Sequence, residues 1–60
     1  MIRGTIKAYS KDVNAGVIQC EDGKTYDFSQ DEWNDRTAPH AEQRVLFQAY
    51  SRKATKVFSE

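Results

Sequence analysis

The side chains that most often carry catalysis or bind metals are few in this 60-residue chain. A nucleophilic cysteine or serine needs a base within hydrogen-bond reach, but the single cysteine, Cys20, has only one histidine, His40, as a candidate partner. His40 lies in a polar stretch typical of an exposed loop. The acids at residues 31–35 are better explained by helix capping and solvation than by metal binding. No Cys or His pair has zinc-ligand spacing, and no Gly-rich loop precedes a helix. The sequence therefore predicts no enzyme, no metal site and no cofactor.

The charges are balanced in number but not in position. Nine basic and nine acidic side chains give a formal net charge of zero. Residues 1–20 and 43–60 are predominantly basic, whereas residues 21–42 hold seven of the nine acids. The two basic ends could form a basic face, but the total charge provides no long-range attraction for phosphate.

Length and cysteine content suggest one small domain in a reducing compartment. Sixty residues, with seven aromatic side chains, suit a single folded unit spanning residues 1–60 with a small core. The lone Cys20 excludes an internal disulfide. No apolar run resembles a signal peptide or a membrane span, so we expect a cytoplasmic protein without membrane contact.

Apolar and polar residues alternate at every second position over most of the chain, which predicts strands. An Asp-Gly pair at residues 22–23 indicates a hairpin turn. By this alternation Cys20 points inward, and Ala49 points inward with Val45 and Phe47. The expected strands span residues 2–7, 16–20, 25–28, 44–50 and 54–58.

The segment between the third and fourth strands contains one helical signal. Ser29 and Glu32 have the spacing of a capping box, which predicts a helical turn. Trp33 would then fold back over the core, and residues 34–43 would form the longest loop. Five strands in so short a chain predict an all-β fold, a five-stranded antiparallel barrel of OB-fold type with one helical turn after the third strand.

Three short motifs carry a family resemblance. Residues 4–10 read GTIKAYS, residues 13–18 read VNAGVI and residues 24–29 read KTYDFS. This spacing resembles the cold-shock domain family, whose motifs read GTVKWFN, KGFGFI and VFVHFS. Residues 42–47, EQRVLF, resemble the family's later GQxVxF motif, and Ala54 and Val57 resemble its closing Ala and Val. The likeness covers most of the chain and implies a small barrel that binds single-stranded RNA or DNA.

The resemblance is weakest at the positions that stack on bases in the family. Its aromatic and histidine side chains there are replaced by Ala8, Ala15, Val17, Thr25 and Asp27. Each stacked base contributes about 1–3 kcal/mol to binding. The sequence therefore predicts weak binding, or binding with altered specificity.

Seven residues remain as candidates for nucleic-acid contacts. Lys7 and Phe28 match the family, and Tyr9 keeps an aromatic ring where the family has Phe. Burial at the barrel edge is the alternative role for both rings, and simple solvent exposure is the alternative for Lys7. First and fourth strands are neighbours in such a barrel, so basic residues on them are expected to cluster. The candidates are Arg3, Lys7, Tyr9, Lys11, Asn14, Phe28 and Arg44.

Two functions remain open at this point. The first is weak binding of single-stranded RNA or DNA. The second is a protein-interaction module on a reused barrel, because a fold does not determine a function. In that case Ala8, Ala15, Val17 and Leu46 would form an apolar face for a protein partner or a second copy of the chain. A regulatory or structural domain with no binding of its own fits the sequence as well as the interaction module does.

Overall fold

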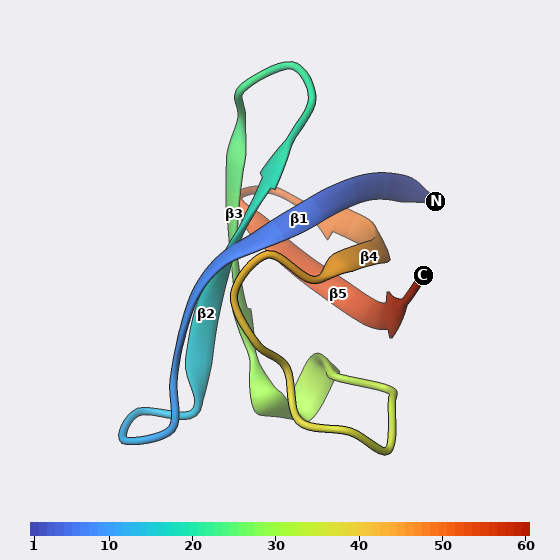
Figure 1. Cartoon of the computed structure of the whole chain (residues 1–60). Coiled ribbons are helices and arrows are strands. Elements are labelled where there is room, and N and C mark those ends of the chain that lie inside the picture. The colour runs from blue at the N-terminus through green and yellow to red at the C-terminus, as the bar shows by residue number, and fades with distance from the viewer.

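Five strands and one short helix make up the computed structural model, which describes residues 1–60 (Figure 1). The strands form a closed barrel in the order β1-β2-β3-β5-β4, which confirms the predicted all-β fold of OB type. All strand pairs are antiparallel except β3 and β5, which meet in parallel at one position. The elements are β1 (Ile2–Ser10), β2 (Ala15–Cys20), β3 (Thr25–Ser29), the 3-10 helix η1 (Gln30–Glu32), β4 (Arg44–Tyr50) and β5 (Lys53–Ser59).

The core is a single cluster contributed by all five strands. Its members have less than 5% of their surface exposed, and all of them are apolar, as burial without hydrogen-bond partners requires. Five further side chains pack around it as half-buried residues: Ile2, Tyr9, Cys20, Tyr26 and Trp33. The core residues are Ile6, Ile18, Phe28, Val45, Phe47, Ala54 and Val57.

A bulge in β1 changes which of its side chains face inward. Ile6 pairs with Ile18, but the next pairing is Ala8 with Val17, so β1 contains one extra residue at this point. Such a bulge breaks the strict alternation of a strand. Ile6 and Tyr9, three positions apart, therefore both face the core.

A second bulge has the same effect in β5. Between the pairs Leu46–Phe58 and Gln48–Thr55, one residue of β4, Phe47, lies opposite two residues of β5, Lys56 and Val57. Lys56, within this interval, has a left-handed backbone with φ 49°, and its N–H donates to Glu32 Oε1 at 3.1 Å. This geometry lets Ala54 and Val57, also three positions apart, both reach the core.

The end of the barrel near η1 is covered by Trp33. Its ring lies 6.3 Å from that of Phe28, and its indole N–H donates to the carbonyl of Thr37 at 2.7 Å. The backbone N–H of Asn34 donates to the carbonyl of Val57, which ties the start of the long loop to β5. The predicted cover over the core is confirmed.

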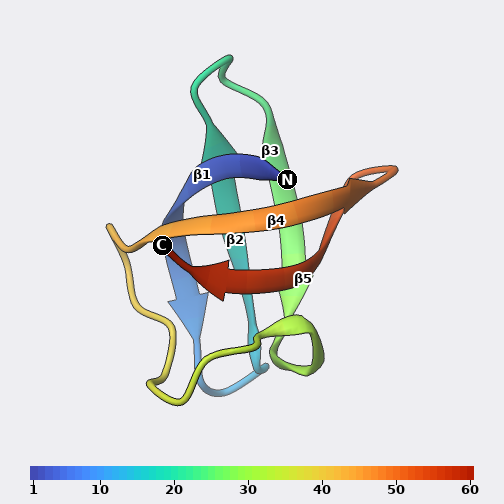
Figure 2. The ribbon, with the colours of Figure 1, turned by 90° about the vertical axis from the view of Figure 1, so that its right-hand side faces the viewer.

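Three local expectations need correction. Neither bond of the predicted capping box forms: Ser29 makes no side-chain capping bond, and the Glu32 carboxylate accepts from the N–H of Lys56. Ala49 is exposed although its cross-strand partner Ala54 is buried; it lies next to the last residue of β4, and Figure 2 shows the β4–β5 hairpin projecting from the barrel. Cys20 is half-buried at the edge of the core rather than inside it. No helix of the chain is long and apolar enough to cross a membrane.

Candidate functional site

The outer face of β1, β2 and β3 is where the family resemblance places base stacking, and it carries no aromatic ring. Ala8, Val17 and Asp27 form one row across the three strands. The neighbouring rows are Thr5–Gln19–Thr25 and Ser10–Ala15–Ser29. Small and polar side chains of this kind offer a base no flat surface to stack on.

The two predicted binding rings belong to the barrel interior or its edge. Phe28 is 3% exposed, so almost none of its ring is available to a base. Tyr9 is half-buried and stacks on Phe28, with 6.0 Å between the ring centroids and 22° between the planes. Phe28 is packed too tightly to serve as a stacking platform. Tyr9 is partly buried at the edge of the barrel.

Gly16 makes this ring pair possible. It lies between Tyr9 and Phe28 in the cross-strand pairing of β1, β2 and β3. A Cβ atom at this position would lie 2.6 Å from the carbonyl oxygen of Ala8 and 2.8 Å from the nearest ring carbon of Phe28. Only glycine leaves room for the Phe28 ring above the β2 backbone.

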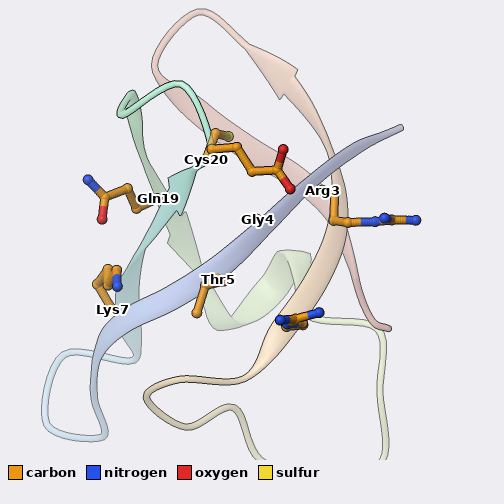
Figure 3. A pocket seen from close by; sticks show the side chains of 8 residues that line it. Arg3, Gly4, Thr5, Lys7, Gln19 and Cys20 are labelled. Atoms are coloured by element: carbon orange, nitrogen blue, oxygen red, sulfur yellow. The ribbon is translucent and has the colours of Figure 1, made fainter.

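Three of the predicted basic residues lie together, as expected from the strand order. Arg3, Lys7 and Arg44 line a shallow pocket of about 280 Å³ on the outer side of β1, hereafter the cationic pocket. Figure 3 shows Lys7 beside Gln19 at this pocket, with Arg3 on the far side of β1 from them. The remaining residues that line it are Gly4, Thr5, Gln19, Cys20 and Glu21.

The pairing of β1 with β4 creates the cationic pocket. Arg44 is the cross-strand partner of Thr5, and Leu46 is the partner of Arg3. Arg3 and Arg44 are therefore diagonal neighbours on one face of the sheet, a separation of about 7–8 Å that long side chains span. Lys7 continues the outward positions of β1 beyond Thr5.

Two acids moderate the positive charge of the cationic pocket. Arg3 Nε lies 2.7 Å from Glu60 Oε2, in an ion pair whose arginine side chain is 66% exposed. The Glu60 side chain is only 29% exposed, so the pair is partly shielded from water, but it engages Nε alone and leaves the other donors of the guanidinium free. Glu21 lies at the rim. Three cations against two acids give a modest positive site with room for a phosphate group.

Lys11 and Asn14 lie outside the cationic pocket, in the turn between β1 and β2. Asn14 has a left-handed backbone with φ 54°, which asparagine tolerates better than most residues. Its carbonyl accepts a hydrogen bond from the N–H of Gln30 at 2.9 Å. These contacts give Asn14 a structural role in the turn.

The proposed apolar face is divided by polar residues. Ala8 pairs with Val17, and Ala15 lies two positions along β2 from Val17. Leu46 lies beside Arg3, which is five positions from Ala8 along β1. The cationic pocket intervenes, so these four residues do not form one continuous patch.

Sequence reasoning missed the aromatic residues on the outer side of β4 and β5. Tyr50 is 78% exposed and Phe58 is 40% exposed. The signal was present: with Val45 and Phe47 inward, the alternation in β4 places residues 46, 48 and 50 outward.

The remaining reactive groups form no further site. Burial raises the pKa of the Cys20 thiol, and the nearby carboxylates of Asp22 and Glu21 raise it further. The thiol is therefore protonated at neutral pH and a poor nucleophile. No three His, Cys, Asp or Glu side chains lie close enough together to hold a metal ion.

No protein-family model and no curated protein matches this sequence.

Proposed function

We propose that this chain is a cold-shock-like domain that binds single-stranded RNA or DNA weakly, mainly through its phosphates. The observation that carries the proposal is that Arg3, Lys7 and Arg44 all line one pocket of the outer surface. Arginine and lysine on a sheet surface neutralise phosphate charge without reading sequence. The barrel type adds support, because OB-type barrels commonly bind oligonucleotides.

Weak affinity follows from the missing stacking platforms. The outer face of β1 to β3 has no ring, and each lost platform removes about 1–3 kcal/mol. Three cationic contacts give a salt-dependent attraction of the kind that supplies non-specific binding, for which dissociation constants of about 10⁻⁴–10⁻⁶ M are typical. The proposal therefore places affinity in the micromolar range or weaker.

A protein-interaction module remains the alternative function. This alternative requires one continuous apolar face, but Leu46 and Ala8 lie apart, so the face is interrupted. A monomer in solution, together with nucleic-acid-induced changes at the cationic pocket, would favour the nucleic-acid proposal.

The test is a titration of ¹⁵N-labelled protein with unstructured oligouridylate and oligothymidylate at low ionic strength. Amide and side-chain signals of Arg3, Lys7 and Arg44 are expected to shift most. The variants Lys7→Gln and Arg44→Gln should weaken binding several-fold, because each removes one phosphate contact. Lys11→Gln is the matched control, since Lys11 lies outside the cationic pocket, and it should have little effect. No shifts at millimolar oligonucleotide would overturn the proposal.

A further inference from the structure

The outer side of β4 and β5 combines exposed aromatic rings with basic side chains. Tyr50 lies at the end of β4 and is paired with Lys53, and Phe58 on β5 is paired with Leu46. We call this surface the β4–β5 face. It comprises Arg44, Leu46, Gln48, Tyr50, Lys53, Thr55 and Phe58.

The β4–β5 face is continuous with the cationic pocket. Alternate residues of β4 from position 44 to position 50 point outward, because Val45 and Phe47 between them are fully buried. Arg44 therefore belongs both to the cationic pocket and to the start of this row. Six residues at about 3.3 Å each place Tyr50 about 20 Å from Arg44. Figure 2 shows β4 and β5 running side by side to the projecting hairpin.

The rings of Tyr50 and Phe58 differ in how much of their surface is exposed. Tyr50 is the most exposed large apolar side chain of the chain, at 78%, and the core does not use it. Phe58 is 40% exposed beside the half-buried Leu46, so part of its ring is supported and part is open. Rings held next to cations are the combination that binds single strands by stacking and charge together.

We infer that the bases of a bound single strand stack on Tyr50 and Phe58, while Arg44 and Lys53 contact its phosphates. This inference rests on the proposed function and specifies which part of the ligand each residue contacts. The strand would run along β4, on the side of the barrel formed by β1, β4 and β5. The face carries a cation at each end, Arg44 and Lys53, and the acid paired with Lys53 is Asp27 on β3; a cation at each end favours a polyanion over an apolar protein partner.

The distance between Tyr50 and Phe58 determines which form of nucleic acid this face can bind. Phe58 lies opposite Leu46, four residues from Tyr50 along β4, or about 13 Å. Neighbouring bases of a stacked strand are about 3.4 Å apart. The two rings therefore hold separate bases of an extended, unstacked strand, and a duplex cannot present its bases to them.

The test compares Tyr50→Thr with Tyr50→Phe in the full chain. Threonine keeps strand propensity and removes the ring, whereas phenylalanine keeps the ring. The ligands are an oligothymidylate and an abasic oligonucleotide of the same length, measured by fluorescence anisotropy at low salt. Tyr50→Thr should bind the oligothymidylate about 5- to 150-fold more weakly, which is the range of one stacked base. It should bind the abasic strand like the unaltered protein, and Tyr50→Phe should resemble the unaltered protein throughout.

Each other outcome has a distinct meaning. If Tyr50→Thr binds the oligothymidylate as tightly as the unaltered protein, stacking on Tyr50 is excluded while the proposed function stands. An equal loss for the abasic strand would also overturn the inference, because the residue would then act without a base. If the unaltered protein binds neither ligand, the proposed function fails and the inference fails with it.

Discussion

Replacing Gly16 with alanine tests the packing that holds the barrel together beneath Tyr9 and Phe28. The added Cβ would lie 2.6 Å from the carbonyl oxygen of Ala8, and 2.8 and 3.0 Å from two ring carbons of Phe28. Ordinary van der Waals contacts begin near 3.4 Å. The Ala8 oxygen is backbone and the Phe28 ring is in the core, so neither moves away easily.

The expected destabilisation is large for so small a domain. Overpacking of a filled core costs about 1–3 kcal/mol, while 60 residues at roughly 0.05–0.15 kcal/mol each give a total stability of about 3–9 kcal/mol. A loss of about 2 kcal/mol lowers the melting temperature of a domain of this size by about 8–16 °C.

Urea unfolding monitored by the fluorescence of Trp33 measures this effect, because its half-buried ring packs against Phe28. The double variant Gly16→Ala with Phe28→Leu should lose less stability than the sum of the single variants, since the smaller side chain relieves part of the clash. An unchanged unfolding free energy for Gly16→Ala would refute the reasoning about the ring pair.

Three further predictions concern local features. Lys56→Gly should raise the unfolding free energy by up to about 1 kcal/mol in urea titrations, because φ at this bulge is 49° and glycine adopts it without strain; a clear loss of stability would contradict it. Glu32→Ala should lower the free energy of unfolding by about 0.5–1.5 kcal/mol, because it leaves the N–H of Lys56 without its carboxylate partner. An unchanged urea midpoint of unfolding would count against that hydrogen bond. The Cys20 thiol has a raised pKa, so it should react with iodoacetamide more slowly at pH 8 than a free cysteine does. Its contribution to stability should be lost as the pH rises above about 8.5, because the thiol of the unfolded chain ionises first. A reaction rate equal to that of free cysteine would contradict this prediction.

The barrel was predictable because alternation of apolar residues is a local signal. Ile6, Ile18, Val45 and Phe47 lie in the core where the strand pattern places them. The capping box predicted at Ser29 and Glu32 was wrong, because Ser29 makes no side-chain cap bond and Glu32 accepts instead from the N–H of Lys56, 24 residues later, a partner visible only in the fold.

The bulge in β1 made the orientation of Tyr9 unpredictable from the sequence. A simple alternation from Ile6 places Tyr9 outward, where it could stack on a base, but the extra residue in β1 turns it toward Phe28. The clustering of Arg3, Lys7 and Arg44 was predicted correctly, because it requires only that β1 and β4 are neighbours. Tyr50 and Phe58 were overlooked, although the alternation in β4 and β5 near Leu46 contained the signal.

Salt dependence tests the central claim, that phosphate contacts at the cationic pocket carry the binding. A fluorescent oligothymidylate titrated between 20 and 200 mM salt, on the order of one decade, should give a plot of log K against log salt with a slope between about −2 and −3, because three phosphates neutralised at the cationic pocket and a fourth at Lys53 contribute about 0.7 each. A variant lacking all three charges, Arg3→Gln, Lys7→Gln and Arg44→Gln together, should lose most of that slope. Binding that is independent of salt, or a slope that the triple variant leaves unchanged, would contradict the account.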